Sequence, residues 1–337
     1  MTRFYLLDLS LIPPPDAVRV LDFDVSHAAW LAAAQAEAAR YGYAYNVASL
    51  RSDPAGWAMR VGAYRGDIYK SQEVNDGVKA VLLATATGAD LDNVCADLAI
   101  ARQTLVPADL TVTPPVPAIM ESDDSLRRRR ALAPEALSVA GPNAAYLFYA
   151  LDAHPDVRDC AVYGPEHGVG VPDGCVWMVL LSKSGQGGQA SPQVCLAVAK
   201  HLAAWDAPDV AAYIRPTPSE LDANTLRPNT ARITVQAATI HPYTVSGTLI
   251  VPPGADADVL RLTTQNRIAA YAAARNKVGA KHTRDSLIAA GRMLNADGTS
   301  AAISFQLVQP VADMDPGPLG AAWLATIISL NVVVADG

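Results

Sequence analysis

Apolar positions in the first hundred residues recur with the spacing of amphipathic helices. Over residues 24–40, alanines and other apolar side chains repeat every three or four positions, which predicts one such helix. A second helix is predicted after Asp53-Pro54, because an aspartate can cap a helix whose first position is a proline. Its apolar stripe consists of side chains spaced by four and then three residues, Trp57, Val61 and Tyr64.

Two further helical segments complete this region. One covers residues 74–86 and is expected to close at Gly88, since glycine favours the left-handed backbone that ends helices, and the next begins near residue 90. Residues 21–104 are therefore predicted to form a helical domain. A run of three prolines at residues 13–15 restricts the backbone before it, so residues 1–20 are expected to be an extended arm.

Prolines also mark a boundary further along the chain. Residues 105–120 contain Pro114, Pro115 and Pro117 and have the composition of a stiff, Pro-rich linker. The sequence Ser122-Asp123-Asp124 follows, with a side-chain cap and acids in the first turn, where the helix dipole favours negative charge. Residues 121–158 are therefore predicted to be central helices.

The pattern changes beyond residue 159 to short apolar strands separated by helices. Short links between successive strands favour antiparallel hairpins. Residues 159–254 are predicted to form one α+β domain and residues 255–337 a C-terminal α+β domain. The expected strands cover residues 160–163, 175–182, 233–240, 243–251, 303–308 and 324–334. The fold class predicted is α+β, with a helical N-terminal domain followed by mixed α/β modules that have mainly antiparallel sheets.

Two of these strands, residues 176–181 and 327–334, are apolar on both faces. Each must then be covered on two sides. Small modules have limited material for this, so we expect the isolated chain to self-associate or to depend on a smaller partner for solubility.

Composition narrows the possible partners. A chain of 337 residues is long enough for several domains. Its formal net charge of -7 gives no general attraction to nucleic acid or to an anionic membrane surface, so neither is expected as a partner. The longest apolar stretch, residues 323–335, is shorter than the ~20 residues that span a bilayer. The first eight residues lack the layout of a signal peptide, and synthesis and assembly in the cytoplasm are expected.

No catalytic, cofactor-binding or metal-binding residues are predicted, and the chain is not expected to be an enzyme. The four cysteines, Cys95, Cys160, Cys175 and Cys195, show no CxxC spacing, and the six histidines form no HExxH motif. The glycine-rich residues 185–190 lack the phosphate-loop pattern, and Asp90, Asp92 and Asp97 are explained by a helix start. No GxSxG motif occurs, although a triad assembled from distant segments stays open.

The run Arg127-Arg128-Arg129-Arg130 is the main basic cluster. Consecutive helical residues point about 100° apart, so these side chains do not form a strip on one face for phosphates. Acids lie nearby at Glu121, Asp123, Asp124 and Glu135. We therefore expect ion pairs within or between subunits rather than binding to nucleic acid.

Three groups of segments resemble the Baseplate J family. The first is Ser52-Asp53-Pro54, Ala63-Tyr64-Arg65, Val74-Asn75-Asp76 and Gly88-Ala89-Asp90-Leu91-Asp92. The second and most specific runs through residues 121–129 and 132–142 to Tyr146 and Ala150-Leu151. The third is Arg227-Pro228 with Pro242-Tyr243. The chain departs from the family pattern at Gly66, where relatives often carry an acid, and at Asn229.

This resemblance implies a structural wedge protein of a contractile phage-type tail. Wedges would surround the hub and spike, paired copies of the chain would link neighbouring wedges into a ring, and smaller wedge subunits would lie beside it. Sheath-initiator proteins are the remaining expected partners. The ring would hold the sheath extended until host contact triggers contraction. The location implied is the virion tail baseplate, assembled in the host cytoplasm, and no cofactor is expected. The alternatives are a tail-associated enzyme such as a peptidoglycan hydrolase, or a host-surface binding protein; phage, headless bacteriocin and other contractile injectors all stay open.

Overall fold

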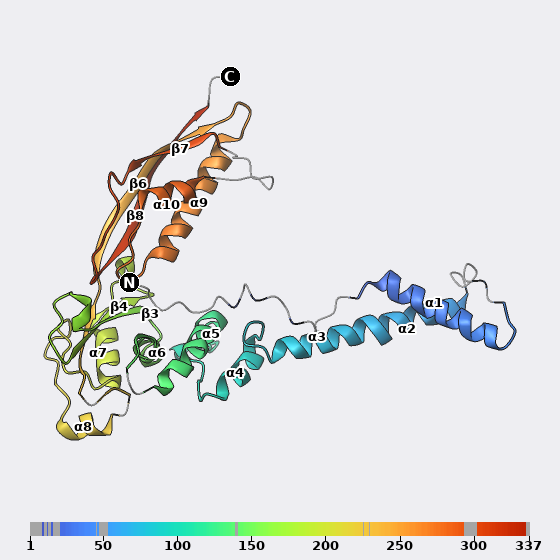
Figure 1. The fold of residues 1–337 in the computed structure, drawn as a ribbon, viewed down its shortest axis with the longest axis horizontal. Coiled ribbons are helices and arrows are strands. Elements are labelled where there is room, and N and C mark those ends of the chain that lie inside the picture. The colour runs from blue at the N-terminus through green and yellow to red at the C-terminus, as the bar shows by residue number, and fades with distance from the viewer. Residues whose placement is uncertain are drawn as a thin grey trace. The chain divides into compact units, whose positions relative to one another are not determined.

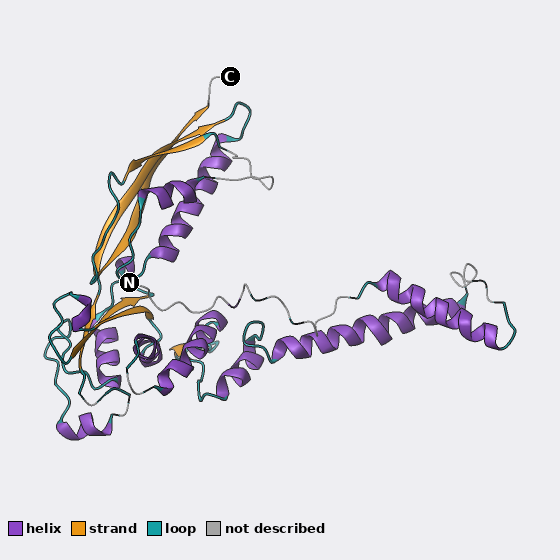
Figure 2. Cartoon of the chain, in the orientation of Figure 1, coloured by secondary structure: helices purple, strands orange, loops and turns teal. Residues whose placement is uncertain are grey.

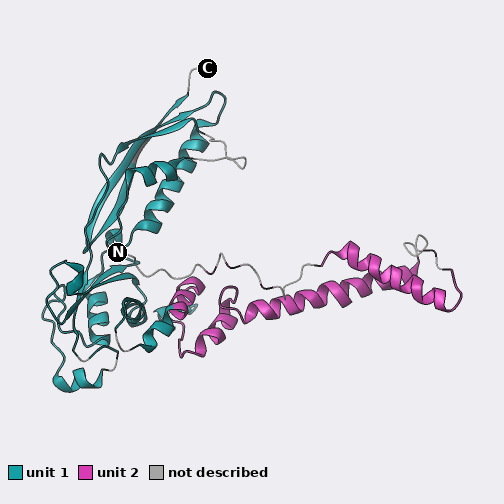
Figure 3. Ribbon diagram, viewed as in Figure 1, with its two compact units in different colours: residues 1–4, 103–119, 132–337 teal, residues 5–102, 120–131 magenta. Residues whose placement is uncertain are grey.

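The computed structural model forms two compact units (Figure 3). The helical unit contains residues 5–102 and 120–131, and the α+β unit contains residues 1–4, 103–119 and 132–337. The structure describes residues 9, 12, 15, 21–44, 46, 53–138, 141–224, 226–228, 230–292 and 302–334. Most of the expected arm at residues 1–20 thus lies outside the described residues, and Asn229 lies outside them too. Helices come first and two three-stranded sheets follow, so the predicted α+β fold class is confirmed (Figure 2).

The helical unit begins with two helices that are each capped by an aspartate, and the cap at Asp53 is the one that was predicted. Helix α1 (Phe23–Arg40) follows Asp22, whose side chain accepts a hydrogen bond of 3.0 Å from the Val25 amide. Helix α2 (Pro54–Gly62) follows Asp53, which accepts from the Ala55 amide at 3.2 Å. A π-helix, η3 (Ala63–Tyr69), and helix α3 (Lys70–Ala80) continue α2 without interruption.

The helix predicted over residues 74–86 ends early, at Ala80. In the turns that follow, the Thr85 hydroxyl donates to the Lys79 carbonyl at 2.7 Å, and such local side-chain bonds compete with helix formation. Gly88 does not close that helix as expected. It is the first residue of α4 (Gly88–Ala96), and its φ of +54° explains why a glycine stands at this start.

Trp30 joins α1 to the continuous helix. A side chain on either Gly62 or Gly66 would collide with or crowd its indole, because Cβ atoms built there would lie 2.8 and 3.2 Å from the ring. Trp30 Nε1 donates to Asp67 at 2.8 Å, and the Ser26 hydroxyl donates to the same carboxylate. Both hydrogen bonds lower the pKa of Asp67, and the bond from Ser26 has the larger effect. Gly66, one of the departures from the resembled family, therefore makes room for the indole together with Gly62.

The apolar stripe of this continuous helix faces solvent. Stripes of this kind ordinarily face a core, yet Trp57 is 58% exposed and no residue of α1 is fully buried. Other exposed apolar side chains of the same helices are Val25, Val61, Tyr64, Tyr69 and Val74. The helical unit thus presents a large apolar surface that its own described residues do not cover.

The α+β unit contains two three-stranded sheets (Figure 1). In the first, β3 (Val157–Tyr163) pairs antiparallel with β4 (Cys175–Ser182), which pairs parallel with β5 (Arg232–Ala237). In the second, β6 (Thr239–Val251) is central, antiparallel to β7 (Ser304–Gln309) and parallel to β8 (Gly320–Val334). The expected mainly antiparallel character is thus accompanied by one parallel pair in each sheet.

Helices cover these sheets, and shorter elements link them. Helices α6 (Asn143–Ala153) and α7 (Pro192–His201) pack on the first sheet, and α9 (Ala257–Arg275) and α10 (Arg284–Gly291) lie along one face of the second (Figure 1). The remaining elements are β1 (Thr104–Val106), β2 (Ile119–Met120), α5 (Asp123–Leu132), η4 (Ala133–Leu137), η5 (Pro165–His167), η6 (Gln186–Gly188) and α8 (Pro218–Ala223). Strands β1 and β2 pair within the segment expected to be a Pro-rich linker.

The expected order of hairpins is wrong at β7 and β8, which each pair with β6 and not with one another, and it is wrong at β5 and β6. Strands β5 and β6 are consecutive but belong to different sheets, and Ala238 alone separates them. A two-residue turn is the shortest common hairpin link, so one residue cannot reverse the chain. The Ala238 amide instead donates to Leu180 in the first sheet, and the Thr239 amide donates to Leu319 beside the second.

His282 is fully buried in the core of the second sheet. Its Nδ1 lies 2.8 Å from the Tyr243 hydroxyl, and burial lowers its pKa from the usual 6.5. The unfolded chain therefore binds this proton more readily than the folded chain. The free energy of unfolding should hold its full value above about pH 6.5 and fall as the pH drops below it. Urea unfolding at several pH values should show this slope, and H282Q should lose that component of it.

Candidate functional site

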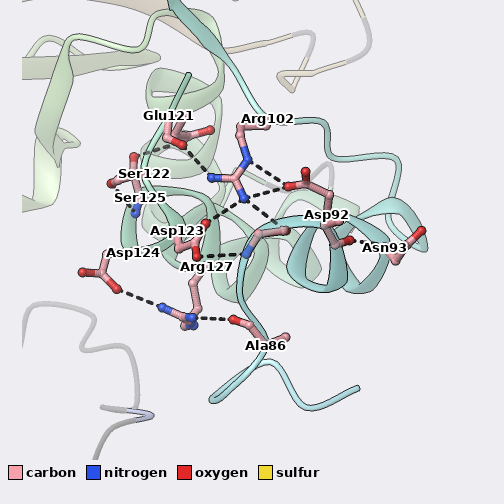
Figure 4. A network of polar contacts seen from close by, with 12 residues as sticks. Ala86, Asp92, Asn93, Arg102, Glu121, Ser122, Asp123, Asp124, Ser125 and Arg127 are labelled. Atoms are coloured by element: carbon pink, nitrogen blue, oxygen red, sulfur yellow. Dashed lines mark hydrogen bonds and ion pairs between the residues drawn. The ribbon is translucent and has the colours of Figure 1, made fainter. Parts of the chain in front are cut away.

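The strongest cluster of polar contacts surrounds α4 and α5 in the helical unit (Figure 4). Helix α5 carries Arg127 to Arg130 at its fifth to eighth positions, so the predicted helical placement of this run is confirmed. Arg102, which follows α4, adds a fifth guanidinium. We call Arg102 with Arg127–Arg130 the arginine cluster.

A buried ion pair lies at the centre of the arginine cluster. The side chains of Arg129 and Glu121 are 3% and 1% exposed. Arg129 donates through Nε and Nη2 to the two carboxylate oxygens at 3.1 and 2.7 Å, and Nη2 also donates to the Ala101 carbonyl at 2.6 Å. The Ser125 hydroxyl donates to the same carboxylate at 2.7 Å. A buried charge pair requires such additional partners, because desolvation costs as much as the attraction returns.

Arg102 connects the starts of the two helices. It donates to Asp92 at 2.9 Å through Nε and to the Glu121 carbonyl at 2.6 Å, and Nη2 lies 2.8 Å from Asp123. Burial by itself lowers the pKa of Arg102, but the bonds to Asp92 and Asp123 outweigh it and raise that pKa above its usual value.

Asp123 caps a helix other than its own. It is the first residue of α5, and its carboxylate accepts a hydrogen bond of 3.0 Å from the Gly88 amide at the start of α4. Thr87, the residue before α4, makes no side-chain cap. The bond from Gly88, followed by that from Arg102, lowers the pKa of Asp123.

Arg127 and Arg130 fasten the two segments that flank α4. Arg127 donates to the carbonyls of Leu83 and Ala86 at 2.8 Å each, before α4. Arg130 holds Asp97 in a two-pronged contact of 3.2 and 2.9 Å, after α4. Neighbouring arginines thus turn to different partners, as the helical geometry predicts.

The predicted ion pairing within the chain is confirmed for Arg127, Arg129 and Arg130. The arrangement can hold α4 and its flanking segments in one position relative to α5. Pairing between subunits stays a prediction. The expected place of Asp97 at a helix start is wrong, because Asp97 directly follows the last residue of α4. Its pairing with Arg130 is a contact between distant segments and was not predicted from the sequence.

The other residues considered in the sequence analysis, namely the possible metal ligands, the cysteines and the glycine-rich loop, do not form a common site among the described residues. Among the described residues, no three His, Cys, Asp or Glu side chains are placed to share a metal ion. All four cysteines are free thiols, and burial raises the pKa of Cys195 to about 12. In the glycine-rich loop after β4, Gly187 packs so closely against Ile240 and Trp323 that a Cβ would lie 2.5 Å from Ile240. A glycine at position 187 therefore allows the loop after β4 to pack closely against β6 and β8 of the second sheet.

The sequence did not reveal a cavity of about 440 Å³ in the α+β unit. Four segments line it: residues 143–147, 160–167, 278–281 and 315–318. Among the lining side chains are Cys160, Tyr163, His167 and Pro318. His167 Nδ1 accepts from the Gly164 amide at 3.0 Å, and the Cys160 thiol contacts the Ala161 carbonyl at 3.8 Å. The Cys160 thiol and His167 Nδ1 are thus both in contact with backbone atoms. The cavity could not be predicted from the sequence, because the segments that line it are far apart along the chain.

Residues 51–109 match the Baseplate J-like N-terminal domain. Over 312 residues, covering 92% of each chain, the sequence is 32% identical to Baseplate protein J of Escherichia phage P2. These matches place the chain among the structural proteins of phage baseplates. It belongs to the Baseplate J family, so the resemblance found in the sequence is confirmed.

Proposed function

We propose that the chain is a wedge component of the baseplate of a contractile tail, where it forms the ring around the hub and helps to transmit the trigger for contraction. The observation that carries this proposal is the identity of 32% with Baseplate protein J of Escherichia phage P2 over nearly the whole of both chains. Such coverage supports a shared role for the entire molecule rather than for one borrowed domain.

The helical unit supports a role in assembly. Its exposed Trp57, Val61 and Tyr64 lie on one continuous helical stretch, residues 54–80. Apolar side chains gathered in this way are a liability in an isolated chain and a binding surface in a complex. We propose that a second copy of the chain and a smaller wedge protein cover this surface, and that the purified chain self-associates or needs that partner for solubility.

The arginine cluster supports the transmission of movement. A trigger requires elements that move as rigid bodies between two arrangements. Four arginines of the cluster, Arg102, Arg127, Arg129 and Arg130, join α4, α5 and the flanking segments through charged contacts, one of them buried. We propose that this part of the helical unit keeps its internal structure while its interfaces rearrange.

The remaining partners in the proposal are the hub and spike proteins and the sheath-initiator proteins. Nucleic acid and membrane are not included. No helix in the described part of the chain is long and apolar enough to cross a bilayer. We propose assembly in the host cytoplasm and a final location in the virion tail baseplate.

Deletion of the gene tests the structural role. We expect the deletion strain to produce no complete contractile tails, and a plasmid copy of the wild-type gene to restore them. Electron micrographs would show the result directly. Normal tails with working baseplates in the deletion strain would contradict the proposal.

We also propose that the chain has no enzymatic activity. The purified protein should not clear a cell-wall zymogram and should not contain zinc near one equivalent. Clearing that disappears on substitution of a single residue would support the alternative of a tail-associated hydrolase.

A further inference from the structure

Two arginines of the α+β unit share one tryptophan. Trp205 lies in the loop between α7 and α8, Arg215 lies in the same loop, and Arg232 is the first residue of β5. The guanidinium carbons of Arg215 and Arg232 lie 4.7 and 4.8 Å from the centroid of the Trp205 ring. We call these three residues the Arg–Trp–Arg stack.

The loop that carries the stack is held firmly against the first sheet. The Trp205 amide donates to the Ile233 carbonyl at 2.7 Å, and Arg215 Nε donates to the Trp205 carbonyl at 3.1 Å. Ala203 and Ala212 in this loop have positive φ angles of 46° and 55°. Non-glycine residues adopt this strained conformation only where the surroundings impose it, and such positions cluster at functional sites.

The two guanidinium groups differ from those of the arginine cluster because they lack acidic partners. Across the described residues, neither Arg215 nor Arg232 makes an ion pair, and both are exposed. Two nearby acids already accept backbone bonds, Asp206 from Ala207 at 3.0 Å and Asp209 from Ala237 at 2.6 Å. Two positive charges stacked on one indole thus face solvent in a chain of net charge -7.

An apolar side chain stands next to this pair. Ile214 is 87% exposed and directly precedes Arg215. Tryptophan and arginine are the side chains most enriched among those that dominate protein interfaces. Stacking on the indole also limits the freedom that each arginine would lose on binding.

We propose that the Arg–Trp–Arg stack and Ile214 bind an acidic segment of another protein chain. Carboxylates of that segment would accept paired hydrogen bonds from Arg215 and Arg232, and an apolar side chain beside them would cover Ile214. Two positive charges beside an exposed isoleucine fit such a segment better than a nucleic acid, which needs a row of cations along its backbone.

Complementation of the deletion strain tests this site, and it relies on the proposed function only for the presence of neighbouring subunits. The double variant R215E/R232E should reduce complete particles at least roughly ten-fold relative to the wild-type gene. I214D should also reduce them. The control R261E reverses an exposed arginine that pairs with Asp258 on α9, and it should assemble normally. Unfolding midpoints of the purified variants would establish that each one folds.

A direct test uses R215K in assembled particles. A zero-length carbodiimide reagent joins an amine to a carboxylate in contact with it, so we expect a link from position 215 to an aspartate or glutamate of a different chain. Full rescue by R215E/R232E, or links from position 215 only within its own chain, would overturn the inference. So would salt-sensitive binding of the wild-type chain to a short DNA duplex that the double variant loses. If the wild-type gene itself were dispensable for assembly, the proposed function would fail instead.

Discussion

Replacing Arg129 by methionine should lower the free energy of unfolding by about 3 to 5 kcal/mol. Methionine roughly fills the space of the arginine stem but leaves Glu121, whose side chain is 1% exposed, without its cation. The Ala101 carbonyl loses its bond from Arg129 as well. Urea unfolding followed by circular dichroism would give the loss, and hydrogen exchange would place it in α4 and α5.

A double replacement distinguishes the lost pair from the stranded charge. R129M/E121L removes both charges, so it should recover most of the loss, because a buried pair replaced by apolar residues is often nearly neutral. R261M breaks an exposed ion pair with Asp258 and should cost less than about 1 kcal/mol. Equal losses in R129M and R261M would show that burial of the Arg129–Glu121 pair does not matter.

Features set by neighbouring residues could be predicted from the sequence. The aspartate and proline at residues 53 and 54 specify the start of α2, since the cap and the first helical position lie side by side. The helical positions of Arg127–Arg130 also follow from local signals, and so does their failure to form one basic face. The family resemblance rests on similar short strings and was confirmed over nearly the whole chain.

Features set by distant residues could not be predicted in the same way. Periodicity shows that Trp57, Val61 and Tyr64 share a face, but it does not show whether the chain itself covers them. The identity of Asp97 as the partner of Arg130 depends on contact across 33 residues. The assignment of β5 and β6 to separate sheets depends on Ala238, whose neighbours in space lie far away in sequence.

The two strands predicted to be apolar on both faces have different outcomes. In β4, Val179 and Leu181 pack in a core cluster with Ala161 and Val278, and Leu180 on the opposite face is also fully buried. The chain therefore covers both faces of β4 by itself. In β8, Val333 is 49% exposed. The expectation that each strand needs a partner to cover it is thus wrong for β4 and stays a prediction for the end of β8.

This difference leads to a comparison of two truncations in the purified chain. L180A should lower the free energy of unfolding by about 2 to 5 kcal/mol, because it removes three carbons from a fully packed site and leaves a cavity. V333A should cost less than about 1 kcal/mol, because water already reaches half of that side chain. Urea unfolding at a concentration where the wild type is monomeric would measure both. A small loss in L180A would mean that β4 is not packed as described. A large loss in V333A would mean that the end of β8 is already covered in the isolated chain, and the case for a partner there would fall.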